Sequence, residues 1–174
     1  LDNETLNEVH LTFIGDGDKI DELKNEIRKT QLENVTIVDF LQPKVLAKEY
    51  SKHDVFIMPT LSDPWGLVVN EAMASGLPII CSDRAGSARD LVISKWNGYT
   101  YDGSDFLSLK SIIEKVLDQK DLIETMGNNS LKLIKYYSSE NSANGFINAV
   151  LNKHNNVEDK IKIFREKNIG IKYK

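Results

Sequence analysis

The chain has 174 residues, of which 41% are hydrophobic and 28% charged, and its formal net charge is −4. This length fits one domain, or one domain with an appendage, that buries a sizeable core. The acidic balance argues against a nucleic-acid binder, which usually has a basic body, and the longest apolar runs fall far short of the roughly 20 residues that cross a bilayer.

Short β-branched runs alternate with amphipathic stretches along the first hundred residues. Residues 9–15 are rich in strand formers and end on a glycine. Apolar residues at spacings of three and four then predict a helix over 18–32, with Asp18 as its N-cap. The same patterns continue along the chain and predict strands at 34–40, 54–60, 78–83 and 97–101, and helices at 43–52, 66–75 and 87–93.

From residue 105 onward the pattern is helical, and three short polar segments predict breaks between helices. These segments lie near 119–120, 138–139 and 155–156. We expect a Rossmann-like domain over 1–152 and a basic helical tail over 153–174.

The tail differs from the rest of the chain in charge. Residues 153–174 carry seven Lys or Arg against three Asp or Glu, whereas the rest carries fifteen against twenty-three. Val157, Ile161 and Phe164 recur at helical spacing among the basic residues. Two interpretations stay open: an amphipathic helix that docks on another domain or on an anionic membrane surface, or a partly frayed helix in solvent.

Five strands separated by helices predict an α/β fold with a doubly wound parallel sheet. In such folds, ligands bind where the carboxyl ends of the strands meet helix N-termini. The unusual segments of this chain lie at those ends, one after each of the first four strands: "GDGD", "DFLQP", "SDPWG" and "DRAGS".

The segment after the third strand, "LSDPWGLVVNEAMASGLPII", combines two acids with the start of a helix. The first amides of that helix have no acceptor within it and favour an anion such as a phosphate. They belong to Gly66, Leu67 and Val68. Asp63 and Glu71 flank these amides and would take the hydroxyls of the same ligand. Alternatively, Asp63 only caps the helix and Glu71 faces solvent.

The stretch "VFIMPTLSDPWGLVVNEAMASGLPIICSD" resembles the core motif of family-4 retaining glycosyltransferases, which have the two-Rossmann-domain GT-B fold. The shared pattern is an acid, seven residues, then Glu, with an aromatic-Gly-Leu step between them and "EAMA-x-G-x-P" at the end. Further motifs resemble the family in the same order over about 9–145: "FIGDGD", "YSKHDVFIMPT", "AGSARDLV" and "NGYTY". The resemblance implies one half of a GT-B fold with extra C-terminal helices.

The resemblance also implies roles for single residues. Glu71 would bind the ribose hydroxyls of a nucleotide-sugar donor, and Asp63 would hold the transferred sugar, which makes these two acids the catalytic-site residues. The implied donor contacts are Gly15, Gly17, Asp39, Phe40, Leu41, Trp65, Gly66, Leu67, Val68 and Glu71. The family generally uses no metal or other cofactor, and its retaining reaction is thought to proceed by front-face attack, so the protein positions the reactants and stabilises charge.

The chain departs from the family pattern at several points. Asp63 stands where Glu is commoner, and Asp39 where Gly is frequent. Family members carry an Arg and a Lys upstream of "FIGDGD", whereas residues 1–10 contain neither. From the resemblance we also expect an amino-terminal, acceptor-binding Rossmann domain that residues 1–174 do not include. We therefore expect residues 1–174 alone to be catalytically inactive and to bind nucleotides weakly.

We interpret the chain as the donor-binding part of a retaining glycosyltransferase in polysaccharide or glycoconjugate synthesis. Its expected partners are the nucleotide-sugar donor, the missing amino-terminal domain and a membrane surface, but no nucleic acid. The single cysteine, Cys81, cannot form an internal disulfide and favours a reducing, cytoplasmic setting. The resemblance implies a location peripheral to the inner face of the membrane, where such enzymes often act.

Two other classes of function stay open. The first is a non-catalytic nucleotide-sugar-binding or assembly subunit that completes a cleft with a partner chain. The second is a dinucleotide-dependent oxidoreductase, but "GDGDKI" lacks the third glycine of that motif. Asp16-Gly17-Asp18 is similar to a metal-binding Asp-x-Asp motif, although its place before a helix favours a turn.

Overall fold

The computed structural model describes residues 6, 8–151 and 156–169. The chain divides into two compact units, residues 1–49 and residues 50–174, which are described separately. Within the described residues, no helix combines the length and apolar character that spanning a membrane requires.

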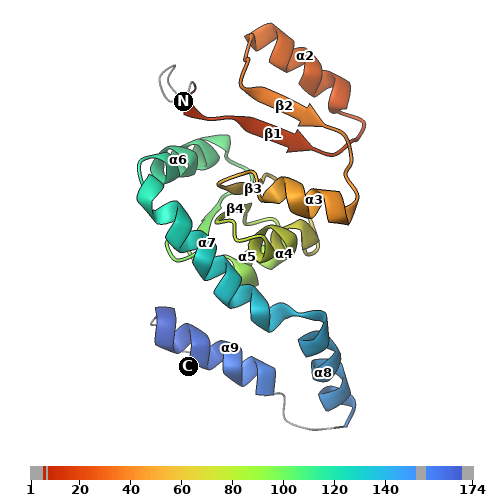
Figure 1. Ribbon diagram of the computed structural model, residues 1–174, viewed down its shortest axis with the longest axis vertical. Coiled ribbons are helices and arrows are strands. Elements are labelled where there is room, and N and C mark those ends of the chain that lie inside the picture. Colours follow the sequence, from red (N-terminus) through yellow and green to blue (C-terminus); the bar gives the residue numbers. More distant parts are fainter. Residues whose placement is uncertain (1–5, 7, 152–155, 170–174) are drawn as a thin grey trace. The chain divides into compact units, whose positions relative to one another are not determined.

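The described part of the first unit contains a two-stranded parallel sheet and helices (Figure 1). Its strands pair in register, from Leu11 opposite Val35 to Ile14 opposite Val38. Its elements are β1 Leu11–Ile14, α2 Ile20–Thr30, β2 Val35–Val38 and α3 Pro43–Tyr50, whose last residue opens the second unit.

The second unit contains a three-stranded parallel sheet of order β3-β4-β5 and helices that follow one another to the end of the described chain. Its strands are β3 Phe56–Met58, β4 Ile79–Ser82 and β5 Gly98–Tyr101. Its helices are α4 Leu67–Ala74, α5 Gly86–Leu91, α6 Phe106–Leu117, α7 Lys120–Ile134, the 3₁₀ helix η1 Lys135–Tyr137, α8 Ser139–Val150 and α9 Asn156–Ile169.

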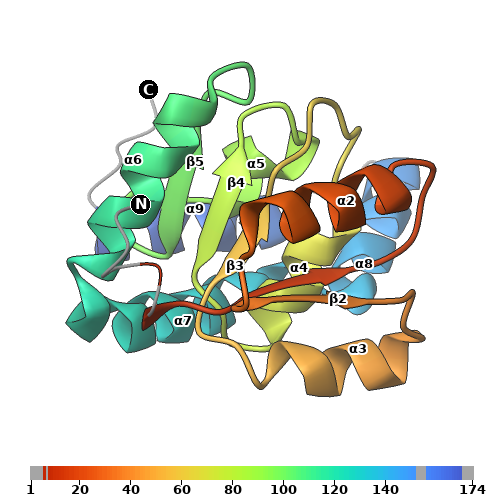
Figure 2. The ribbon, with the colours of Figure 1, turned by 90° about the horizontal axis from the view of Figure 1, so that it is seen from above.

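Helices cover both faces of the β3-β4-β5 sheet (Figure 2). On one face, Ile80 and Tyr99 pack with Val116 of α6 and Met126 of α7. Cys81 points to the opposite face because side chains alternate along a strand. Helix α4 contacts β3 and β4 there. All four residues of β4, Ser82 included, are buried, as expected of a strand that is covered on both faces.

The α/β class and the parallel direction of the strands are confirmed. Hydrogen bonds join the strands in two groups, β1-β2 and β3-β4-β5, rather than in one ladder of five. The predicted cap Asp18 is wrong: Lys19 is the N-cap of α2, and no side chain caps this helix. The main chain closes the turn instead, because the Ile20 amide donates to the Gly17 carbonyl at 3.0 Å.

The predicted breaks between the C-terminal helices are confirmed, since α6, α7, α8 and α9 start close to the predicted positions. Phe164 of α9 packs edge-on against Trp96, with ring centroids 5.5 Å apart. Its ring is tilted against that of Tyr136, with centroids 5.2 Å apart. Arg165 donates to the Asp90 carbonyl at the end of α5. At Phe164, the apolar face of the tail helix is therefore occupied within the chain. Residues 153–155 and 170–174 of the predicted tail lie outside the described residues.

Candidate functional site

The acid loop, residues 61–66, joins β3 to α4 and carries Asp63. One carboxylate oxygen of Asp63, Oδ1, accepts a hydrogen bond from the Trp65 amide at 2.9 Å and so closes a tight turn. The other oxygen meets no hydrogen-bond donor among the described residues. The side chain forms no helix cap, because α4 has no side-chain cap bond. Asp63 is partly buried and keeps an oxygen available for a ligand.

Helix α4 starts without a hydrogen bond from a capping side chain. Gly66 stands at its N-cap with φ 81° and ψ 64°, a left-handed conformation that favours glycine. The first main-chain bond of the helix runs from the Val69 amide to the Gly66 carbonyl at 2.9 Å. No acceptor from the described residues meets the amides of Gly66, Leu67 or Val68. Together with the helix dipole, these donors form a site suited to an anion.

Glu71 lies in the second turn of α4 and is partly buried. The Tyr50 hydroxyl donates to Glu71 Oε2 at 3.4 Å, a long hydrogen bond. Tyr50 is only 5% exposed and packs edge-on against Phe56. Burial, and next the neighbouring Glu71 charge, raise the pKa of Tyr50 above its usual value, so the hydroxyl stays a donor. Glu71 is therefore held by a neighbour rather than directed wholly into solvent.

Trp65 fills the acid loop. Its indole Nε1 donates to Asn70 Oδ1 at 2.8 Å, and the ring is partly buried. This bond ties the loop to the first turn of α4. The arrangement agrees with a turn-filling role for Trp65.

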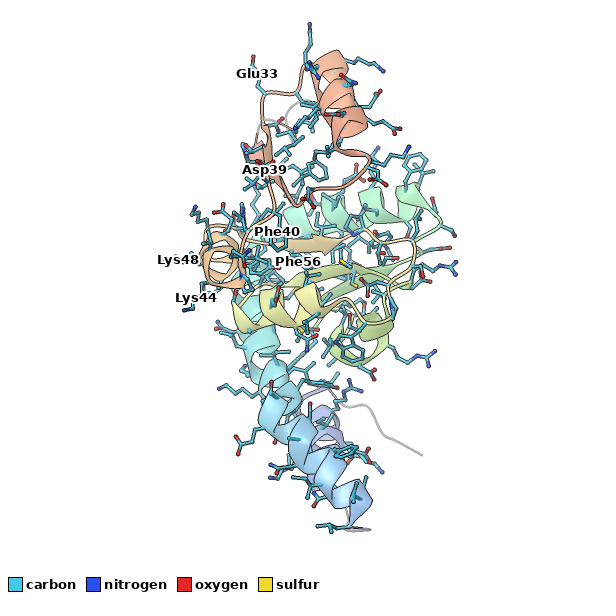
Figure 3. All side chains as sticks on the ribbon, turned by 90° about the vertical axis from the view of Figure 1, so that its right-hand side faces the viewer. Glu33, Asp39, Phe40, Lys44, Lys48 and Phe56 are labelled. Atoms are coloured by element: carbon cyan, nitrogen blue, oxygen red, sulfur yellow. The ribbon has the colours of Figure 1, made fainter. Side chains whose placement is uncertain are left out.

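The remaining predicted donor contacts lie in the first unit, at the carboxyl ends of its two strands. The Gly15 amide donates to the Val38 carbonyl at 3.0 Å, which places the segment after β1 beside the segment after β2. These segments carry Gly15, Gly17, Asp39, Phe40 and Leu41. Asp39 and Phe40 follow β2 directly (Figure 3), and Phe40 is 62% exposed. In the same view Lys44 and Lys48 point outward from α3.

The structure thus distributes the predicted site residues over both units. Asp63, Trp65, Gly66, Leu67, Val68 and Glu71 share one loop and one helix of the second unit, whereas the other five belong to the first. Among the described residues, no three His, Cys, Asp or Glu side chains gather in a way that could hold a metal ion, and this includes Asp16 and Asp18.

Two contacts near the acid loop were not predicted from the sequence, although the segments that make them were noted. Tyr50 was noted only as part of a motif, although the hydroxyl of a buried Tyr usually has a hydrogen-bond partner. The segment after β4 also runs beside the acid loop, as the Asp63–Ala85 bridge shows. That pairing depends on the register of β3 and β4, which no local pattern reveals.

Comparison with protein families matches residues 1–133 to the family Glycosyl transferases group 1. The chain is 36% identical over 97 residues to the sulfoquinovosyl transferase SQD2 of Arabidopsis thaliana. This match covers 56% of this chain and 18% of that protein. A capsular polysaccharide biosynthesis glycosyltransferase, CapM of Staphylococcus aureus, is 30% identical over 106 residues, with 61% of this chain and 27% of that protein covered.

Among solved structures, the chain is similar to sucrose-phosphate synthase of Thermosynechococcus elongatus, with a TM-score of 0.65 and 26% identity over 72% of this chain and 33% of that one. The GT-B fold is also shared with Anabaena HepE in complex with UDP, with a TM-score of 0.72 and 24% identity over 83% of this chain and 41% of that one. The chain therefore spans between about a fifth and two fifths of the length of these proteins.

Proposed function

The chain belongs to the family Glycosyl transferases group 1, and from this membership we propose that it is the donor-binding part of a retaining, family-4-like glycosyltransferase. It binds a nucleotide-sugar donor, and the whole protein transfers the sugar to an acceptor in polysaccharide or glycoconjugate synthesis. The observation that carries the proposal is the uncapped start of α4, with three amides free to bind an anion directly after Asp63.

Each part of the site has a role in this proposal. The amides of Gly66, Leu67 and Val68 bind the diphosphate, because an anion at a helix N-terminus gains both hydrogen bonds and a favourable dipole. Asp63 accepts hydroxyls of the sugar through its available oxygen, and Glu71 accepts the ribose hydroxyls. The segment Asp39–Leu41 contacts the base, while Gly15 and Gly17 allow the chain to approach the donor closely.

The proposed reaction retains the configuration at the sugar carbon C1. The acceptor oxygen bonds to C1 on the face from which the diphosphate leaves, the bond between C1 and the diphosphate oxygen breaks, and the acceptor proton passes to that oxygen. The residues of this chain hold the donor and stabilise the charge that develops on the diphosphate. No metal ion is needed in this scheme, so transfer should continue in the presence of EDTA.

The test uses the chain joined to an amino-terminal GT-B domain, which completes the cleft. Asp63→Asn and Glu71→Gln should each lower the rate of sugar transfer roughly tenfold to hundredfold, because each removes a charged hydrogen-bond acceptor. Glu114→Gln on α6, whose carboxylate lies 3.6 Å from Lys110 Nζ, is the matched control and should leave the rate unchanged. Unchanged transfer in both site variants would reject the proposed roles.

Residues 1–174 alone should show no transfer, because a half-cleft neither encloses the reactants nor offsets the diphosphate charge. Isothermal titration with UDP and GDP should detect weak binding or none, and tight binding would contradict this part of the proposal. A completed cleft that binds a nucleotide sugar but transfers nothing would favour the alternative, a non-catalytic nucleotide-sugar-binding or assembly subunit.

A cytoplasmic location at the inner face of a membrane is a separate part of the proposal. Lys160 and Lys167 are exposed on α9, and Ile163 between them is 49% exposed. Such a strip is attracted to anionic lipid headgroups. Sedimentation with vesicles that contain an anionic lipid should retain the chain more strongly than neutral vesicles do, and equal retention would remove the membrane from the proposal.

A further inference from the structure

A second segment runs beside the acid loop and is bonded to it along its length. We call this segment, Arg84–Ser87, the clamp. The Asp63 amide donates to the Arg84 carbonyl at 3.2 Å, and the Gly86 amide donates back to the Asp63 carbonyl at 3.0 Å. The Ser87 amide donates to the Trp65 carbonyl at 2.9 Å. Asp63 and Ala85 thereby form a parallel bridge beyond the ends of β3 and β4.

Gly86 makes this close approach sterically feasible. A Cβ atom added at Gly86 would lie 2.0 Å from the Pro64 carbonyl oxygen and 3.3 Å from Trp65 Cα. The first distance is far below a van der Waals contact, and both atoms belong to the main chain. Any other residue at this position would therefore push the acid loop away from the clamp.

The clamp also lies behind the start of α4. Ser87 is 0% exposed, and its Oγ lies 3.5 Å from the position that a Cβ on Gly66 would take. Ala85 Cβ lies 3.8 Å from the same position. The clamp thus contacts both the residue that carries the acid and the residue that begins the helix.

We propose that the clamp is a positioning element, and that Gly86 is the residue that permits it. It fixes the Asp63 carboxylate and the amides at the start of α4 in one relative geometry before a ligand arrives. A site that is held in place loses less free energy on binding, and a displacement of about 1 Å can lower a rate roughly a hundredfold. The role of the clamp in donor binding rests on the proposed function.

The test compares Gly86→Ala with Gly127→Ala. The control glycine lies in α7, and its added Cβ would meet the Gly76 carbonyl oxygen at 2.1 Å, a main-chain clash of the same size at the other end of α4. In the protein with a completed cleft, Gly86→Ala should raise the KM for the donor at least roughly tenfold and leave the KM for the acceptor unchanged. Gly127→Ala should lower the melting temperature but change neither KM.

Amide hydrogen exchange tests the clamp without any ligand. In the unmodified chain the amides of Asp63, Gly86 and Ser87 should be protected, and Gly86→Ala should abolish this protection. If Gly86→Ala does not fold, Arg84→Ala replaces it: the half-exposed guanidinium lies 3.4 Å from Asp83 and 3.8 Å from Asp102, so its loss should speed exchange at the Asp63 amide while the fold is kept.

The outcomes separate the two proposals. Unprotected Asp63 and Ser87 amides in the unmodified chain would overturn the clamp, and so would equal changes in donor KM for Gly86→Ala and Gly127→Ala. Protected amides in a completed protein that binds neither UDP nor GDP would support the clamp as a structural unit and reject the proposed function.

Discussion

At the scale of single residues, the site contains buried groups whose chemistry can be tested without a ligand. Asp63 and Glu71 each use one oxygen within the chain, with the Trp65 amide and the Tyr50 hydroxyl respectively. Both acids therefore have defined positions before any donor arrives. Cys81 and Ser87 lie nearby and are buried, but neither has a place in the proposed reaction.

The thiol of Cys81 should be inert in the folded protein. Burial, and next the Asp63 charge, raise its pKa from 9.0 to about 12. Because only the thiolate is nucleophilic, a thiol reagent at pH 8 should react slowly with the native chain and rapidly with the chain unfolded in concentrated urea.

The raised pKa of Cys81 also contributes to the free energy of unfolding below pH 9, and this contribution should fall as pH rises from 9 towards 12. Rapid labelling of native protein would contradict the burial of this thiol.

Ser87 should be replaceable by alanine without loss of stability. Its Oγ is buried and has no hydrogen-bond partner among the described residues, and such a group costs about 1–3 kcal/mol. Ser87→Ala should therefore leave the free energy of unfolding in urea unchanged or raise it by about 1 kcal/mol. Ser82→Ala is the control: Ser82 is equally buried, but its Oγ accepts from the Arg84 amide at 3.1 Å, so this variant should lose about 1 kcal/mol. Similar losses in both variants would show that Ser87 has a partner.

At the scale of elements, the two ends of α4 invite a direct comparison. Gly66 and Gly76 have almost the same left-handed conformation, with φ 81° and 82°, and a Cβ at either would lie 3.4 Å from the end of a flexible side chain. Both alanine variants should lower the free energy of unfolding by about 1–2 kcal/mol. Only Gly66→Ala should also weaken UDP or GDP binding to the completed protein, because only this end presents free amides. Equal weakening by Gly76→Ala would mean that binding follows stability alone.

The sequence was sufficient to locate these elements because periodicity is a local property. Apolar spacing placed α4 and the breaks before α7 and α8 within two residues, and the acid motif placed Asp63 in a loop and Glu71 on a helix. The start of α2 was wrong at Asp18, because a main-chain bond from Ile20 replaced a side-chain cap. The contacts of the clamp and of Tyr50 were not predicted, because they join residues about twenty positions apart in the sequence.

At the scale of the whole molecule, the two units differ in how much they bury. None of the described residues of the first unit is fully buried, whereas the second contains a core that includes Met73, Leu91 and Leu133. A two-stranded parallel sheet with one row of cross-strand bonds is marginal by itself in water. The free energy that protects β1 and β2 should accordingly be much smaller than that protecting β4 and β5.

Hydrogen exchange followed by mass spectrometry can measure this difference. Peptides over 11–14 and 35–38 should exchange at least roughly tenfold faster than peptides over 79–82 and 98–101, because local opening of a small unit with little buried surface costs less free energy than opening a core strand. In urea, the first unit should unfold at a lower concentration than the second, so that one probe in each unit gives two separate transitions.

Joining the chain to an amino-terminal domain should slow exchange in β1 and β2 more than in β4 and β5, if the completed cleft orders the base-contacting segment Asp39–Leu41. Uniform protection of all five strands in residues 1–174 would contradict the division into two units.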